Sequence, residues 1–291
     1  MRNVTKSFRA IAAGGGLARV MAAHNPLSAM LVEEAGFDGI WASGFEFSAS
    51  QGLPDISLVA MTDHLNTMRA IAERTSLPIV ADIDTGYGNA INVLHVIEQY
   101  ENAGANAIVM EDKTFPKVTS LIAGGRQELL RIEEFQGKIE AAVSVRKDPE
   151  LMIIARVEAL IAGLGEEIAL ERARAYEAAG ADMILIHSKQ KTPDEIESFI
   201  QAWDGEIPIV IVPTAYPQMT EARAEALKKV AMLIYGNHAI RAAVTAMQTV
   251  FEQIIQDGGI EKVNEQIVPV SEIFRLQRMS DVKENEKRFL R

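Results

Sequence analysis

Two aspartates at the end of an apolar run carry the strongest chemical signal in this 291-residue sequence. Segment 78–89 reads PIVADIDTGYGN, so the apolar run ends at Asp82 and Asp84 and then breaks at glycines. Residues i and i+2 of a strand lie on one face, so both carboxylates would point the same way where a loop begins. Like charges this close need a cation or a shared proton. Such hard oxygen ligands suit Mg²⁺, with Mn²⁺ as the alternative, although the pair could instead cap the helix that follows.

Eight short apolar runs recur along the chain, and each is followed by polar residues. They cover residues 18–22, 39–42, 78–82, 107–110, 151–155, 183–186, 208–212 and 232–235, with segments of helical periodicity between them. Segments 34–38, 102–106 and 178–182 each place a glycine where a left-handed helix cap would precede a strand. This alternation predicts an α/β fold that closes as a (β/α)₈ TIM-type barrel. An open doubly wound sheet is the alternative, but its glycine fingerprint after the first strand is absent.

Composition and charge narrow the class of protein further. The net charge of −11 argues against a nucleic-acid partner, because phosphate binding requires a basic surface. The chain has no cysteine, which excludes disulfides, cysteine-ligated zinc and a cysteine nucleophile. No apolar run approaches the roughly 18 residues of a membrane span, and the basic N-terminal segment suits a first helix better than a transit peptide. We therefore expect a cytoplasmic protein that binds a small molecule.

The C-terminal region exceeds what one barrel needs. We expect residues 1–291 to form a single α/β-barrel domain, with about 239–291 as a helical extension. This region includes a predicted helix after Pro269 that carries Ile273, Phe274 and Leu276. The extension could pack in an oligomer or on its own barrel.

Polar residues follow the predicted strands at the end where TIM-barrel active sites form. The candidates for chemistry at this end are Trp41, Ser43, Gly44, Asp55, Asp82, Asp84, Glu111, Arg156 and His187. Glu158, Thr214 and Asn237 stand there without an assigned role. The carboxylates could hold Mg²⁺ and its waters, while Arg156 and His187 could bind an anionic substrate. Such a site would polarise a carbonyl group and stabilise an enolate.

A long polar loop, 112–126, follows Glu111 and ends near paired glycines. Long loops between a strand and a helix are usually lids or binding loops, so we expect this one to close over the site. Lys117 and Arg126 could then meet an anion. A mobile surface insertion is the alternative.

Several motifs at the strand ends occur together in a characteristic order. They read GIWASG at 39–44, DIDTGYGN at 82–89, EDK at 111–113, ARVEA at 155–159 and IHS at 186–188. From about residue 22 to the C-terminus, the sequence resembles the phosphoenolpyruvate mutase/isocitrate lyase superfamily. The isocitrate lyase branch carries a catalytic cysteine in its lid, which this chain lacks, so the resemblance points to the branch that acts on P–C bonds.

The lid distinguishes two activities within that branch. Mutases typically have an asparagine just before the lid serine, whereas segment 117–120 reads KVTS and has Thr119 there. Thr119 and the segments 112–117, 212–218 and 235–241 together resemble the members of this branch that hydrolyse phosphonopyruvate. The implied reaction is Mg²⁺-dependent P–C bond hydrolysis to pyruvate and phosphate. Isomerisation between phosphonopyruvate and phosphoenolpyruvate is the alternative, followed by a 2-oxo acid lyase or decarboxylase acting on a substrate such as oxaloacetate.

The resemblance also implies a role for each candidate residue. Trp41 would wall the substrate pocket, and the substrate's carboxylate and carbonyl would be held by Ser43, Gly44 and Phe45. Asp82 would bind Mg²⁺ directly, and the water molecules bound to Mg²⁺ would be held by Asp55, Asp84 and Glu111. Arg156 and His187 would hold the phosphonyl group, and the lid would bring Lys117, Thr119 and Ser120. The resemblance further implies a homodimer or homotetramer whose C-terminal helices are exchanged between subunits.

Overall fold

The computed structural model describes residues 7–122, 124–125 and 127–290, so Arg126 lies outside the described residues. Eight parallel strands form a closed barrel in chain order, and the last strand pairs with the first. The strands are β1 (Ala18–Ala23), β2 (Gly39–Ala42), β3 (Ile79–Asp82), β4 (Ala107–Glu111), β5 (Met152–Val157), β6 (Met183–Ile186), β7 (Ile209–Ile211) and β8 (Val230–Tyr235). The predicted (β/α)₈ barrel is confirmed, and every predicted run overlaps one strand.

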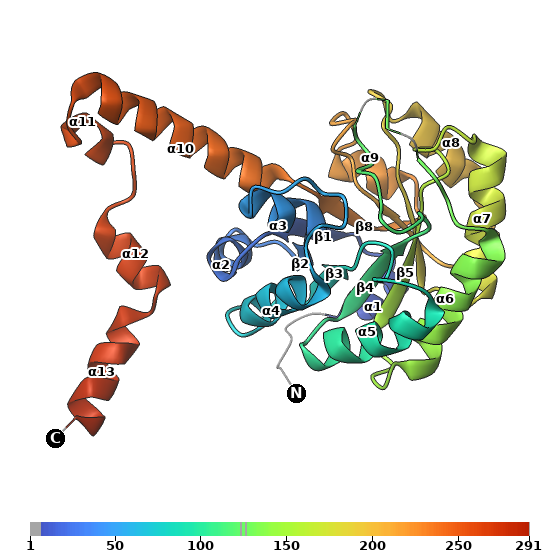
Figure 1. Ribbon diagram of the computed structural model, residues 1–291, viewed down its shortest axis with the longest axis horizontal. Helices are drawn as coiled ribbons and strands as arrows, with labels where there is room; N and C mark the ends of the chain where they lie inside the picture. Colours follow the sequence, from blue (N-terminus) through green and yellow to red (C-terminus); the bar gives the residue numbers. More distant parts are fainter. Residues whose placement is uncertain (1–6, 123, 126, 291) are drawn as a thin grey trace. The chain divides into compact units, whose positions relative to one another are not determined.

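Helices lie outside the ring of strands (Figure 1). They are α2 (Pro26–Glu34), α3 (Gly44–Ser50), α4 (Met61–Ala72), α5 (Ala90–Asn102), α6 (Ile132–Val145), α7 (Glu166–Ala178), α8 (Asp194–Ala202) and α9 (Glu221–Ala226). The predicted first helix is α1 (Phe8–Ala13), and its Phe8 packs with the apolar residues inside the barrel.

Strand residues alternate between two apolar clusters. Ile40, Ile79 and Ile108 pack outward against the helices, whereas Trp41 and Val80 belong to the cluster inside the barrel. This period of two is the geometry of a strand, and bulky residues fill the interior of a TIM barrel. The interior set therefore fixes which later residues of each strand point toward the barrel mouth.

Three glycines end helices just before strands, as the repeated segments predicted. Gly36, Gly104 and Gly180 have φ of 85°, 97° and 99°. These left-handed values suit glycine because it has no Cβ to clash with the backbone.

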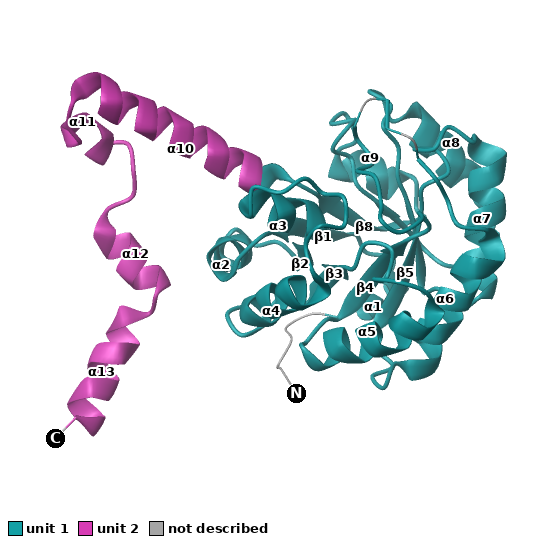
Figure 2. Cartoon of the chain, viewed as in Figure 1, with its two compact units in different colours: residues 1–239 teal, residues 240–291 magenta. Residues whose placement is uncertain are grey.

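The chain divides into two compact units, Met1–Ala239 and Ile240–Arg291 (Figure 2). The second unit contains most of α10 (His238–Asp257), followed by α11 (Glu261–Asn264), α12 (Val270–Leu276) and α13 (Met279–Phe289). Its exposed apolar side chains include Val244, Met247, Phe251, Ile255 and Phe274. The part that this unit plays in oligomer packing stays a prediction. No helix within the described residues is long and apolar enough to cross a membrane.

Candidate active site

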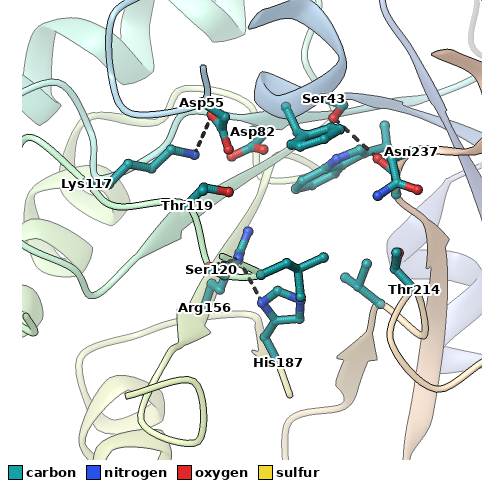
Figure 3. A pocket seen from close by; sticks show the side chains of 15 residues that line it. Ser43, Asp55, Asp82, Lys117, Thr119, Ser120, Arg156, His187, Thr214 and Asn237 are labelled. Carbon is teal, nitrogen blue, oxygen red and sulfur yellow. Dashed lines mark hydrogen bonds and ion pairs between the residues drawn. The ribbon is translucent and has the colours of Figure 1, made fainter. Parts of the chain in front are cut away.

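The alternation inside the barrel places the candidate residues at one mouth. On each of the strands β2 to β6, one candidate follows an interior residue by two positions, and these candidates are Ser43, Asp82, Glu111, Arg156 and His187. A pocket at this mouth is lined by most of the predicted residues: Trp41, Ser43, Phe45, Asp55, Asp82, Lys117, Thr119, Ser120, Arg156 and His187. In Figure 3, Lys117, Asp55 and Asp82 lie on one side of this pocket and Arg156 with His187 on another.

Three carboxylates surround the ammonium group of Lys117. Its Nζ lies 2.6 Å from Asp84 Oδ1, 3.0 Å from Asp55 Oδ1 and 3.6 Å from Glu111 Oε1. Lys117 is 5% exposed, so these ion pairs are largely removed from water. The lid residue thus supplies the positive charge that this group of acids requires.

Burial and mutual repulsion shift the acidity of this group. Burial, opposed by Lys117, raises the pKa of Asp55, Asp82 and Asp84, and their acidic neighbours add to the rise. Burial would also raise the pKa of Glu111, but Lys117, Arg156 and Lys113 together outweigh it and lower that pKa. Burial lowers the pKa of Lys117, yet the surrounding carboxylates outweigh it and hold this pKa well above its usual value. A cation next to these buried carboxylates would therefore be strongly stabilised by their negative charge.

The donor set fits a hard divalent cation bound partly through water. Neither carboxylate oxygen of Glu111 accepts a hydrogen bond within the described residues, although Arg156 Nη2 lies 3.4 Å from Oε2. A buried acceptor without a donor is costly, and a hydrated cation would satisfy it. In the described parts of the chain, no three His, Asp or Glu side chains form a complete metal-ligand group. The expectation that Asp82 alone binds metal directly stays a prediction.

A second cluster, behind the opposite wall, is organised by Glu158. Arg156 Nε donates to Glu158 Oε1 over 2.5 Å, and His187 Nδ1 lies 3.0 Å from the same oxygen. Arg156 Nη2 lies 2.9 Å from His187 Nδ1, so the arginine and the carboxylate compete for one ring nitrogen. Burial and the charge of Arg156 lower the pKa of His187, against the opposing pull of Glu158. The pair thus presents one permanent cation and one imidazole to the pocket.

The lid loop contacts both clusters. Its Ser120 Oγ donates to Glu158 Oε2 over 2.7 Å and accepts from Arg156 Nη2 over 3.0 Å. Lys113 pairs with Leu129 in a β-bridge at the base of the loop. Thr119 lines the pocket and lies between the two clusters in the view of Figure 3. The loop therefore brings Lys117, Thr119 and Ser120 to the pocket, whereas its closure over bound substrate stays a prediction.

The predicted substrate-binding residues have local partners. Ser43 is the N-cap of α3, where its Oγ accepts from the amide of Glu46 over 3.1 Å. The Gly44 amide, predicted to hold substrate, donates to Asp82 Oδ2 over 3.2 Å. A Cβ at Gly44 would lie 3.1 Å from Asp84 Oδ1, a tight contact that the absence of a side chain avoids. This amide thus connects the predicted substrate-binding turn to one of the predicted metal-binding carboxylates.

Several residues of the site received no role from the sequence. Thr214 and Asn237 line the pocket, and their positions after β7 and β8 were the signal. Lys113 and Glu158 are buried behind it and pair at 3.1 Å. No local pattern marks Lys113, because its role depends on how the loop folds back.

Comparisons with known proteins agree with this geometry. The sequence profile of the phosphoenolpyruvate phosphomutase family matches residues 8–255. The chain is 59% identical over 286 residues to a phosphonopyruvate hydrolase of Variovorax sp. (strain Pal2), covering 98% of this chain and 99% of the relative. It is 43% identical to a phosphoenolpyruvate phosphomutase of Tetrahymena pyriformis, covering 94% and 91%.

A crystal structure of a phosphonopyruvate hydrolase complex with oxalate and Mg²⁺ superposes with a TM-score of 0.93 at 58% identity, covering 97% of this chain and 98% of the other. The fold, the order of the motifs and these similarities agree along nearly the whole sequence. The chain therefore belongs to the phosphoenolpyruvate mutase family.

Proposed function

We propose that this chain hydrolyses the carbon–phosphorus bond of phosphonopyruvate to pyruvate and phosphate, with Mg²⁺ as cofactor. The observation that carries the proposal is one pocket with a carboxylate cluster on one side, Arg156 with His187 on another, and Thr119 over it. The near full-length similarity to a phosphonopyruvate hydrolase supports the substrate. The related structure with oxalate and Mg²⁺ supports the metal.

The two sides of the pocket suit the two ends of the substrate. The hydroxyl of Ser43 and the backbone of Gly44 and Phe45 would hold the 2-oxo acid end, with Trp41 as the wall. Arg156 and His187 would hold the phosphonyl oxygens, because a guanidinium provides directed donors for such anions.

The acids on the first side would hold the metal. Asp82 would bind it directly, and Asp55, Asp84 and Glu111 would hold its waters. The chemistry that Mg²⁺ supplies when bound is Lewis-acid stabilisation of the negative charge on the enolate oxygen of pyruvate.

Cleavage of the P–C bond leaves a carbanion, which forms readily only as the enolate of pyruvate. Water attacks phosphorus, the P–C bonding pair moves to carbon as the pyruvate enolate, and a proton then gives pyruvate. Phosphoryl transfer of this kind depends mainly on positioning and charge. Arg156 and His187 position the phosphoryl group, the hydroxyl of Thr119 orients the water, and the lid limits access of other water molecules.

Phosphorus NMR tests this proposal directly. With phosphonopyruvate and Mg²⁺, we expect the substrate signal to be replaced by phosphate, and chelation of the metal to stop the reaction. Asp82→Asn should abolish turnover, whereas Asp182→Asn, next to the Arg9 and Arg146 side chains, should retain it. An unchanged substrate signal with the metal-loaded enzyme would contradict the proposal.

Phosphoenolpyruvate mutase activity is the second candidate. The 43% identity with the Tetrahymena pyriformis phosphomutase favours it, whereas the threonine at position 119 disfavours it. Phosphoenolpyruvate in place of phosphate in the same NMR experiment would identify a mutase. Pyruvate formation from oxaloacetate would instead indicate a decarboxylase.

We further propose that the chain works in the cytoplasm as a homodimer or homotetramer with exchanged C-terminal helices. The exposed apolar side chains of α10 and α12, including Phe251 and Phe274, support a partner of the same kind. Exchange of a terminal element between identical subunits is a low-cost route to such an assembly.

A further inference from the structure

Glu158 is a buried carboxylate just beyond the end of β5. It is fully buried and is not among the described residues that line the pocket. Its amide donates to Asp112 Oδ1 over 2.9 Å, which fixes the backbone from which the side chain projects. Any effect of Glu158 on substrate must therefore pass through other side chains.

The two oxygens of this carboxylate face different parts of the site. Oε1 accepts from Arg156 Nε at 2.5 Å and lies 3.0 Å from His187 Nδ1. Oε2 accepts from the lid hydroxyl of Ser120 at 2.7 Å and lies 3.1 Å from Lys113 Nζ. We propose that Glu158 is a positioning residue that couples closure of the lid to the orientation of Arg156 and His187.

The partners of Ser120 determine which way its hydroxyl group donates. Its oxygen accepts from Lys113 Nζ over 2.5 Å and from Arg156 Nη2 over 3.0 Å, so its single proton goes to Glu158. When the lid opens, Glu158 Oε2 loses this donor and Arg156 loses an acceptor. The carboxylate and the guanidinium then regain freedom that the closed lid had removed, so closure orders both groups together.

The charges behind the pocket favour a fixed carboxylate rather than a neutral acid. Burial would raise the pKa of Glu158, but Arg156, His187 and Lys113 outweigh it and hold this pKa well below its usual value. Lys113 is itself 1% exposed and donates to Val118 O over 2.8 Å, so it stays attached to the lid. An ionised Glu158 can therefore accept hydrogen bonds on both sides at once.

Glu158→Gln tests whether both sides of Glu158 need an acceptor oxygen. An amide offers one acceptor oxygen, so its NH₂ group must face either Ser120 and Lys113 or Arg156 and His187, which already present donors. We expect at least tenfold faster amide hydrogen exchange within residues 113–120 of this variant with Mg²⁺ and oxalate bound. If the variant does not fold, Glu158→Asp replaces it, since a carboxylate shortened by one methylene cannot span both sides.

A double-mutant cycle tests the path of the coupling. The readout is the imidazole NMR resonance of His187 in the Mg²⁺–oxalate complex, assigned with His187→Asn. We expect Ser120→Ala to shift this resonance in the wild-type background and to leave it unchanged when Glu158 is substituted. Asp182→Asn is the control, because Asp182 also joins two cationic side chains but does so through Arg9 and Arg146. It should lower the melting temperature without moving the His187 resonance.

Two results would overturn the inference. Ser120→Ala could leave His187 unchanged in the wild type, which would show that the lid and the pair are independent. It could also shift His187 equally in both backgrounds, which would assign the coupling to the direct contact between Ser120 and Arg156. The inference relies on the proposed role of Arg156 and His187 in phosphonyl binding. Its readouts need no turnover, so they remain informative if the hydrolysis assay fails.

Discussion

Lys117 gives the carboxylate cluster a positive charge from within the chain. Its ammonium lies within 3.0 Å of oxygens of both Asp55 and Asp84, in a site that water reaches poorly. Removal of one partner from a buried ion pair typically costs about 3–5 kcal/mol, because the remaining charges stay uncompensated. A bound divalent cation would supply that compensation instead.

We therefore expect Lys117→Met to lose about 3 kcal/mol of stability in chelator and to regain most of it with Mg²⁺. Thermal unfolding with and without metal measures this, and the Mg²⁺-induced rise in melting temperature should exceed that of the wild type. Lys229→Met is the control, because Lys229 Nζ donates to the carbonyls of Ile200 and Trp203 rather than to acids. Equal metal-induced rises in all three proteins would show that Lys117 does not act as the counter-charge.

Thr119 decides the fate of the phosphoryl group in the proposed mechanism. Thr119→Asn places an amide where a small hydroxyl would orient water, so recapture by the enolate oxygen should compete with hydrolysis. Phosphorus NMR should then show a higher ratio of phosphoenolpyruvate to phosphate than in the wild type. Thr119→Ser keeps the hydroxyl and should keep phosphate as the product. An unchanged product ratio in Thr119→Asn would refute this account of the lid.

Strand alternation explains which site residues the sequence could predict. Asp82, Arg156 and His187 each stand two positions beyond an interior residue, so their direction follows from the local pattern. Glu158 continues the alternation two positions beyond Arg156, but its proposed function depends on Ser120 and Lys113, which belong to a folded loop. Hydrogen bonds between residues 38 positions apart are not encoded in the pattern of either segment.

At the scale of elements, the turn after β3 shapes the carboxylate side of the site. Asp84 and Tyr87 have φ of 51° and 55°, although neither is glycine, and Gly86 has φ of 87°. A non-glycine residue with positive φ has a strained backbone, which persists only where surrounding contacts hold it in place. Lys138 Nζ donates to Thr85 O over 2.8 Å and provides one such restraint. Apolar periodicity predicted the strand before this turn, whereas the conformation of the turn arises from these non-local contacts.

Gly86→Ala tests the turn. Its Cβ would lie 2.8 Å from Val93 Cγ2, a stiff β-branched side chain, in addition to the strain of a positive φ. We expect a loss of about 2–5 kcal/mol, from left-handed strain of about 1–2 and overpacking of about 1–3, together with weaker Mg²⁺ binding. Gly36→Ala is the matched control, since Gly36 has φ of 85° and open space around its Cβ position. Equal melting temperatures, or unaltered Mg²⁺ affinity, would remove the proposed link between this turn and the metal.

At the scale of the whole molecule, the two compact units differ in how they bury apolar residues. The first buries them in two clusters, one between strands and helices and one inside the barrel, and strand periodicity predicts this division. In the second, α10 exposes Val244, Met247, Phe251 and Ile255 along one face. An amphipathic helix indicates that something covers its apolar face, but the sequence of one chain does not identify the cover. The extension was therefore predictable as helices, while its assembly remained a proposal.

Phe251→Glu tests whether a second copy of the chain covers that face. Phe251 is 61% exposed here, and its burial in a symmetric dimer would occur twice, once for each subunit. A charge at each place should weaken self-association at least about a hundredfold, which corresponds to about 3 kcal/mol. Sedimentation equilibrium measures this change. Ala246→Glu adds the same charge to the opposite face of α10 and should leave the association intact. If both variants keep the wild-type mass at all concentrations, α10 does not join the subunits through this face, and the helices that follow it would have to carry the interface.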